Sequence, residues 1–249
     1  MTGPDALAVA AAGLAAGAIN TIVGSGSLVT FPTLLAIGYP AVLANVSNTV
    51  GLVPGSVSGA IGYRRELAGQ RHRILSLLPA AMAGGVAGAA LLLAVPGAFS
   101  DVVPVLILLA VVLVLIQPQV AKRRAAAGRI AEHPGPLLQA GVFLTSIYGG
   151  YFGAAQGVIF LALLALTLDD DLQRLNGVKN VIAAVVNGVA AIFFIAAHHI
   201  AWVAAVILIV ASTIGGQLGA RYGRRIPPNV LRIVIAVVGT GVAIKLLVD

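Results

Sequence analysis

The 249-residue chain contains no cysteine and carries few charges. The lack of cysteine excludes disulfides, thiolate nucleophiles and cysteine-ligated metal sites. Charged residues make up only 9% of the chain and hydrophobic residues 59%, so there is too little polar surface to cover a soluble globule. The apolar runs are continuous and do not alternate at every second residue, which excludes a porin-type barrel. The composition therefore predicts an all-α polytopic membrane protein.

Acidic residues are scarce, with eight Asp and Glu in total, and none falls in the middle of an apolar run. An intramembrane aspartyl protease or a carboxylate proton relay therefore has no candidate residues. The chain has no Walker-type phosphate loop, and no Ser, His and Asp set can be placed at one depth. We predict that the protein is not an enzyme, and that it uses no cofactor and holds no metal.

Apolar runs separated by Gly, Pro or charge clusters predict the membrane elements. At about 20 residues per crossing, the chain has room for eight to ten transmembrane helices. The predicted elements are Asp5–Val23, Ser27–Ile37, Ala41–Tyr63, Ile74–Val95 and Val102–Ile116 in the first half, and Leu137–Phe152, Gly157–Leu168, Leu172–Ala197, Ala201–Ala220 and Asn229–Val248 in the second. The two short runs, the second of each half, are either full spans or arms of re-entrant hairpins.

Both halves have the same order of elements, which predicts an internal duplication. Similar segments lie roughly 130 residues apart, because AGGVAGA (Ala83–Ala89) matches IGGQLGA (Ile214–Ala220) and Gly24 matches Gly153. Five elements per half is an odd number, so the second copy enters the membrane from the opposite side. We predict a helical bundle with a first inverted repeat over 1–117, a cytoplasmic linker over 118–136 and a second inverted repeat over 137–249.

The net charge of +7 indicates orientation in the membrane and does not favour a nucleic-acid partner. Basic residues gather in Arg64–Arg73, Lys122–Arg129 and Arg221–Arg225, and alternation of the spans places all three segments on one side. The positive-inside rule makes this side cytoplasmic and leaves both termini outside. The expected location is the inner (plasma) membrane of a bacterial-type cell, with a multi-pass chain and the lipid bilayer as partner.

Two glycine-rich breaks interrupt the apolar sequence, Gly24-Ser25-Gly26-Ser27 and Gly153-Ala154-Ala155-Gln156-Gly157. Bare backbone at membrane depth is tolerated only inside protein or beside an aqueous cavity. A helix that starts at such a break offers N–H groups and the positive end of its dipole, which suit an anion. The alternative is that the glycines only permit close helix packing. The candidate substrate-binding residues here are Gly24, Ser25, Gly26, Ser27, Gly153, Gln156 and Gly157.

A polar stripe follows each break. Asn45 and Asn48 share one helix face, and Asn180 and Asn187 share another, with Lys179 beside Asn180. Intramembrane amides and lysines usually face a bundle interior or a water-filled path, so all five are further candidates for the substrate site. The alternatives are interhelical hydrogen bonding for the asparagines and snorkelling to the headgroups for Lys179. Glycines at four-residue spacing, such as Gly84 with Gly88, predict helix-contact faces.

These motifs together resemble the sulfite exporter TauE/SafE family of membrane transporters. The resemblance rests on their order: G-x-G-x-L-x-x-x-P-x-L-L-x-x-G over Gly24–Gly38, then Asn45 and Asn48, then Gly-Gly-x-x-Gly-Ala before a basic loop. Lys179–Asn180 and Leu218–Pro227 extend it into the second half. The resemblance implies movement of small sulfur-containing anions such as sulfite and organosulfonates. The second break departs from the pattern, with Ala154-Ala155-Gln156 where glycines are expected.

We therefore expect a secondary transporter of a small anion that works by alternating access between two inverted repeats. The alternative is an anion channel or a facilitator for small organic anions, with no rocking step. The coupling ion is not visible in the sequence, and both a proton and simple facilitated flux remain open.

Overall fold

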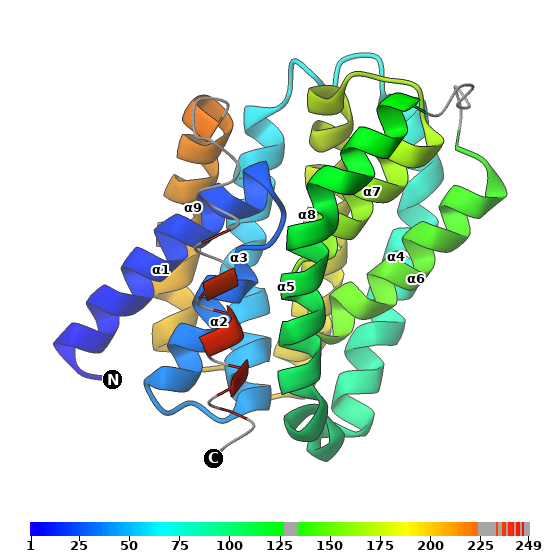
Figure 1. The fold of residues 1–249 in the computed structure, drawn as a ribbon. Coiled ribbons are helices and arrows are strands. Elements are labelled where there is room, and N and C mark those ends of the chain that lie inside the picture. The colour runs from blue at the N-terminus through cyan, green and yellow to red at the C-terminus, as the bar shows by residue number, and fades with distance from the viewer. Residues whose placement is uncertain are drawn as a thin grey trace.

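The computed structural model describes residues 1–126 and 134–223 together with separate positions between 233 and 246. The described ranges fold into helices that stand side by side in a bundle (Figure 1). Their bounds are α1 Gly3–Ile22, α2 Ser27–Ala36, α3 Ala41–Gly62, α4 Arg71–Ala94, α5 Pro96–Ala126, α6 Pro136–Tyr151, α7 Gln156–Thr167, α8 Leu172–Ala197 and α9 Trp202–Tyr222. The chain is thus an all-helical polytopic membrane protein, as its composition predicts.

Local sequence explains where several helices begin. Thr2 and Asp5 form a capping box that starts α1, and Asp171 accepts hydrogen bonds from the N–H groups of Gln173 and Arg174 to start α8. Five helices (α1, α4, α9, α8 and the apolar part of α5) are long and apolar enough to cross a membrane by length and composition. The more polar α3 tolerates its Asn, Ser and Thr side chains because most of them are buried in the bundle.

The structure corrects the predicted bounds of α5. The sequence predicts a span over Val102–Ile116, whereas the helix begins at Pro96 and continues to Ala126, into the predicted linker over 118–136. Proline suits the first turn of a helix, and Lys, Arg and Ala are good helix formers, so the helix outlasts the apolar run. Residues 127–133 of that linker lie outside the described residues. So does most of the predicted last span, whose described positions are helical.

The two short helices are return arms of hairpins that enter from opposite ends of the molecule. In Figure 1, α1 starts at the end that holds the N-terminus and α2 returns to it, whereas α6 starts at the opposite end and α7 returns there. If the α1–α2 and α6–α7 hairpins each consisted of two full spans, their turns would lie at opposite ends of the bundle and could not meet. The turns instead touch, because the N–H of Gly157 donates a hydrogen bond to the carbonyl of Gly24 at 3.2 Å. Both pairs are therefore hairpins whose turns meet inside the bundle.

Long-range packing interlocks the two halves of the sequence. Helix α9, from the second half, packs against both α1 and α3, while α4, from the first half, packs against both α6 and α8. Helices α3 and α8 pack against each other and join these two sets. We call α1, α2, α3 and α9 the first helix group and α4, α6, α7 and α8 the second helix group.

Close approach at glycines makes this interlocking possible. A Cβ on Gly216 would lie 2.5 Å from the carbonyl oxygen of Gly55, and a Cβ on Gly84 would run into the carbonyl oxygen of Phe143. The prediction that glycines at four-residue spacing form helix-contact faces is confirmed. Such small-residue contacts are the usual means of packing helices in a membrane, where no hydrophobic effect drives them together.

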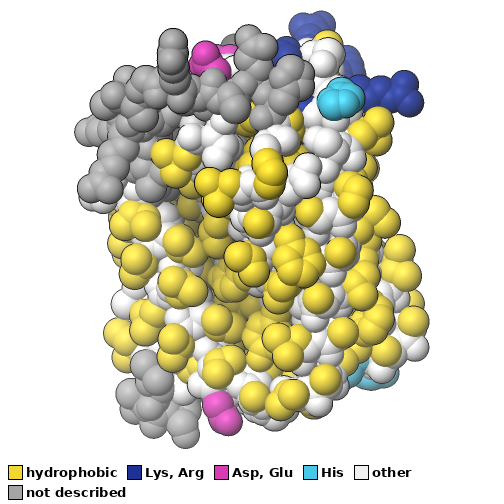
Figure 2. Space-filling model, turned by 90° about the vertical axis from the view of Figure 1, so that its right-hand side faces the viewer, with side chains coloured by type: hydrophobic (Ala, Val, Ile, Leu, Met, Phe, Trp, Pro, Cys, Tyr) yellow, Lys and Arg dark blue, Asp and Glu magenta, His cyan; other side chains and the backbone are white. Residues whose placement is uncertain are grey.

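Charged and apolar side chains are segregated on the surface (Figure 2). Arginines gather at one end of the molecule, and a broad band of hydrophobic side chains covers the flank below them. Many large aliphatic side chains are exposed, among them Leu144 at 64% and Ile192 at 71%. An apolar surface of this extent is a lipid-facing surface in a membrane protein.

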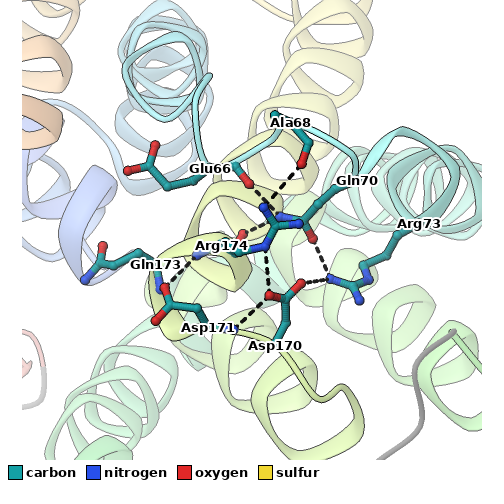
Figure 3. A network of polar contacts seen from close by, with 8 residues as sticks. All are labelled: Glu66, Ala68, Gln70, Arg73, Asp170, Asp171, Gln173 and Arg174. Carbon is teal, nitrogen blue, oxygen red and sulfur yellow. Dashed lines mark hydrogen bonds and ion pairs between the residues drawn. The ribbon is translucent and has the colours of Figure 1, made fainter.

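The arginine-rich end is held by a polar cluster between the α3–α4 and α7–α8 loops (Figure 3). Asp170 pairs with Arg73 at 2.6 Å and with Arg174 at 2.8 Å, while Gln70 donates to the carbonyl of Arg174 and Arg174 donates to that of Ala68. Burial alone would raise the pKa of Asp170, but hydrogen bonds from Arg73, the Asp171 N–H and Arg174 outweigh it and hold this pKa below its ordinary value. The ionised carboxylate of Asp170 thus links the α3–α4 loop to the α7–α8 loop.

Candidate functional site

The two breaks have the same local geometry. Helix α1 ends with the N–H groups of Val23 and Gly24 both bonded to the carbonyl of Ile19, and α6 ends with those of Phe152 and Gly153 both bonded to the carbonyl of Tyr148. Gly24 and Gly153 then take positive φ values of 91° and 78°. Glycine suits this backbone conformation because it has no Cβ to clash. A matched pair of glycines thus turns the chain inside the bundle.

The first turns of α2 and α7 are already hydrogen-bonded. The Gly26 N–H donates to Asn20 Oδ1 at 2.6 Å, and the Gly157 N–H donates to the Gly24 carbonyl. A Cβ on Gly26 would also run into the carbonyl oxygen of Ala16. The N–H groups of Gly26 and Gly157 are therefore not available to bind an anion in this conformation. Gly26 instead permits close helix packing, which is the alternative interpretation of these glycines.

A small cavity lies where the hairpins meet. Its volume is about 10 Å³, which is room for about one water molecule. It is lined by polar side chains and bare backbone from both helix groups: Asn20, Gly24, Ser27, Ser56, Gly153, Gln156, Gly157, Lys179, Asn180, Ala183 and Asn187. Eight of the twelve predicted site residues thus come together around one cavity from three separate parts of the sequence.

Lys179 lies in this lining with a side chain that is 0% exposed. Its ammonium donates to the carbonyl oxygens of Asn20 at 2.9 Å and Thr21 at 3.3 Å, at the C-terminal end of α1. The negative end of the α1 dipole favours a cation there. The snorkelling alternative is wrong, because the side chain turns into the bundle and is fully buried there.

Amide side chains of α8 share the same helix end. Asn176 and Asn180 both donate to the carbonyl of Thr21, at 3.0 and 3.3 Å. Further along α8, Asn187 accepts a hydrogen bond of 2.6 Å from Gln156 in the second break. Helix α8 therefore ties both hairpin turns together with three polar side chains that lie one or two helical turns apart.

Four predicted residues do not line the cavity: Ser25, Gly26, Asn45 and Asn48. Asn48 donates to Ser27 Oγ at 3.3 Å and so supports a residue that does line it. Asn45 donates to the carbonyl of Tyr151 in α6, as the alternative interpretation of interhelical hydrogen bonding predicts. Within the described ranges, Ser25 Oγ, Asn45 Oδ1, Asn48 Oδ1 and Gln156 Oε1 are buried without a hydrogen-bond partner. Buried oxygens of this kind bind water or a ligand in most proteins.

Three lining residues were not predicted from the sequence: the apolar Ala183 and the polar Asn20 and Ser56. Asn20 interrupts the apolar run of α1 four residues before Gly24, so the same signal of a polar residue beside a break could have found it. Ser56 donates its own hydroxyl to the carbonyl of Leu52 one turn earlier, which is common for a serine inside a helix and gives no functional signal.

Comparison with known proteins agrees with this architecture. The family model described as "Sulfite exporter TauE/SafE" matches residues 9–246, which is nearly the whole chain. The chain belongs to the sulfite exporter TauE/SafE family. The match extends across both hairpins and both helix groups, so the cavity is part of the shared TauE/SafE region.

Relatives of this TauE/SafE protein are named as transporters. The "Probable membrane transporter protein YfcA" of Escherichia coli is 24% identical over 94% of this chain and 86% of its own length. A "Probable membrane transporter protein" of Haemophilus influenzae is 24% identical over 99% and 96%, and "Probable membrane transporter protein ORF9" of a Sinorhizobium species is 25% identical over 94% and 89%. No solved structure matches the chain. The chain is a membrane transporter of the TauE/SafE family.

Proposed function

We propose that the protein is a secondary transporter of small anions, with sulfite or organosulfonates as substrates. The observation that carries this proposal is Lys179, a buried cation that lines the cavity and has no carboxylate partner among the described residues. A charge inside a membrane is normally paired or functional. An anionic substrate would supply the missing negative charge.

The other lining groups fit a small oxyanion. Ser27, Asn180 and Asn187 are uncharged side chains with hydrogen-bond donors, so they can bind sulfonate oxygens without neutralising Lys179. The orphaned Gln156 Oε1 favours a ligand that also brings a hydrogen atom, such as bisulfite or a hydroxylated sulfonate. The family description as a sulfite exporter supports the same chemistry.

Alternating access would come from movement of the first helix group against the second. The cavity lies between them, with Asn20, Ser27 and Ser56 on one side and Gln156 and Lys179 on the other. The two hairpins enter from opposite ends and the packing of α9 mirrors that of α4, which supports inverted repeats. The moving bodies are then not the two sequence halves over 1–117 and 137–249, because α4 and α9 are exchanged between them.

Orientation follows from the arginine-rich end. The described arginines at Arg64, Arg65, Arg73, Arg174 and Arg221 lie in or beside the loops at that end, which the positive-inside rule makes cytoplasmic. The N-terminus lies at the opposite end in Figure 1 and would face outward.

Flux into proteoliposomes tests this function. Sulfite, sulfoacetate and taurine are compared with acetate, and we expect saturable uptake and counter-flow exchange of a sulfur anion. Non-saturating conductance in a planar bilayer would favour a channel instead. Ser27→Ala should raise the KM about tenfold by removing a donor from the site, whereas Ser146→Ala is the matched control, because the buried Ser146 hydroxyl donates to the carbonyl of Val142 within α6 and does not line the cavity. Equal effects of both substitutions would contradict the site.

A further inference from the structure

The cavity contains a single charge. Among its described lining residues only Lys179 is ionisable, and the others are Asn, Gln, Ser, Gly and Ala. The ion pairs of the described residues join Asp170 to Arg73 and Arg174, so none involves Lys179. The partners of its ammonium are two backbone carbonyls of α1.

No neighbouring helix brings a second ionisable group to this cavity. Helices α1, α3, α4, α6 and α7 pack against α8. Apart from Lys179, the titratable and charged residues on these elements and at their caps, and on α8 itself, are Asp5, Tyr63, Arg71, His72, Arg73, Tyr148, Tyr151, Asp171, Arg174 and His198. None of them lines the cavity. Any change of charge in the site must therefore occur on Lys179 or on the ligand.

The α1 carbonyls compensate the ammonium only in part. The C-terminal end of a helix is equivalent to roughly half a negative charge. The remaining positive charge is costly in a cavity with room for about one water molecule, since an unpaired buried ion is strongly unfavourable. An anion can remove this cost when it is bound, and loss of a proton can remove it when the site is empty.

We propose that Lys179 couples anion transport to a proton, and this rests on the proposed function. In the loaded state the ammonium faces one monovalent anion and the cavity is neutral. After the anion leaves, the ammonium releases one proton to the same aqueous phase, and the neutral amine returns through the occluded state. Lys179 takes up a proton again on the loading side. One anion and one proton then cross together in the same direction, so net transport moves no charge.

The requirement that the loaded cavity be electrically neutral also selects substrates by their net charge. A monoanion such as methanesulfonate neutralises the cavity. Zwitterionic taurine brings a second ammonium beside Lys179, and dianionic sulfoacetate leaves one negative charge unpaired. We expect methanesulfonate to compete with sulfite at least about tenfold better than either, because a misplaced buried charge costs more than a lost hydrogen bond.

The decisive experiment uses the wild-type protein in proteoliposomes loaded with a pH-sensitive dye. A methanesulfonate gradient should move one proton per anion in the same direction. A valinomycin clamp of about 100 mV would bias one uncompensated charge by roughly 50-fold, and we expect it to leave the rate unchanged. Net anion flux without proton movement, or flux that follows the membrane potential, would overturn the role of Lys179.

Two variants separate exchange from net transport. The guanidinium of Lys179→Arg cannot give up its proton, so this variant should retain anion-for-anion exchange and lose net flux by at least about tenfold. Lys179→Gln has no proton to carry, so any flux that remains should be uncoupled from pH and should respond to the clamp. A folded Lys179→Arg protein with full net flux would contradict the inference. Where neither variant folds, the wild-type stoichiometry decides.

The two proposals fail in different ways. Wild-type protein that shows neither saturable exchange nor saturable net flux of any tested anion would refute the transport function itself. Saturable flux without a coupled proton would refute only the role of Lys179 and would leave the substrate class intact.

Discussion

The N–H of Gly157 donates a hydrogen bond to the carbonyl oxygen of Gly24, and this bond joins the turns of two hairpins that enter from opposite ends of the protein. Both glycines line the cavity. Their backbones approach so closely that a Cβ on Gly24 would lie 2.5 Å from Gly157 Cα. The absence of side chains at this contact is therefore what brings the two breaks together.

Gly24→Ala should destabilise the protein and abolish transport. The added methyl group clashes with α7. The backbone at position 24 also has a positive φ of 91°, which costs an L-residue roughly 1–2 kcal/mol. Gly38→Ala is the matched control, because Gly38 has a φ of 92° but nothing within 4 Å of an added Cβ. Thermal unfolding in detergent should show a clearly larger fall in Tm for Gly24→Ala. Equal falls would mean that the hairpin contact adds nothing.

Asn20→Asp should separate folding from anion binding. The carboxylate still accepts the hydrogen bond of the Gly26 N–H, so the turn is preserved. It also puts a negative charge in the cavity that Lys179 lines, which replaces the anion as the partner of the ammonium. We expect an unchanged or higher Tm and the loss of anion-dependent thermal stabilisation.

Asn20→Ala is the contrasting variant. It leaves the Gly26 N–H buried without its acceptor and should lower stability by about 1–3 kcal/mol. Retained anion stabilisation in Asn20→Asp would argue that the ligand binds away from Lys179.

Asn180→Ala and Asn176→Ala form a matched pair on α8. Each side chain donates to the carbonyl of Thr21, so each substitution should lower stability by a similar amount, about 1 kcal/mol. Only Asn180 lines the cavity. We expect Asn180→Ala alone to raise the KM for anion flux, measured with both proteins reconstituted at equal density. A larger kinetic defect in Asn176→Ala would place the ligand elsewhere.

The Asp170 cluster should lose stability in acid. The folded pKa of Asp170 lies below its ordinary value of about 4, so its contribution is complete above that pH and is lost as the pH falls through the lowered pKa. The Tm should stay level between about pH 8 and pH 5 and fall below about pH 4. Asp170→Asn should lower the Tm at neutral pH and flatten the acid response. The exposed Asp169→Asn is the control and should change neither.

Helix positions could be predicted from the sequence because lipid imposes long apolar runs. The predicted element Leu172–Ala197 coincides with α8, and the predicted Ser27–Ile37 differs from α2 by one residue. The end of α5 could not be predicted in the same way, because a helix that leaves the membrane no longer needs apolar residues.

The candidate site could be located but not assembled from the sequence. Ser27 and Gln156 were identified as polar residues in the glycine breaks, and Asn180 as part of the polar stripe that follows, since such residues are costly in lipid and need a reason to be there. The sequence carries no comparable signal for the tertiary contact that seats Lys179 on the end of α1, because hydrogen bonds to backbone carbonyls require no particular acceptor side chain. That contact was found only in the structure.

The exchange of α4 and α9 between the two helix groups has a consequence for how the chain is made. Helix α1 is synthesised first, yet the helix that fills the space between α1 and α3 is α9, the last of the nine described helices. The glycine faces of α1 and α3 must wait in the bilayer, open to lipid, until nearly the whole protein has been inserted. Contacts so distant in sequence form slowly, so the first group is the last part of this transporter to be completed.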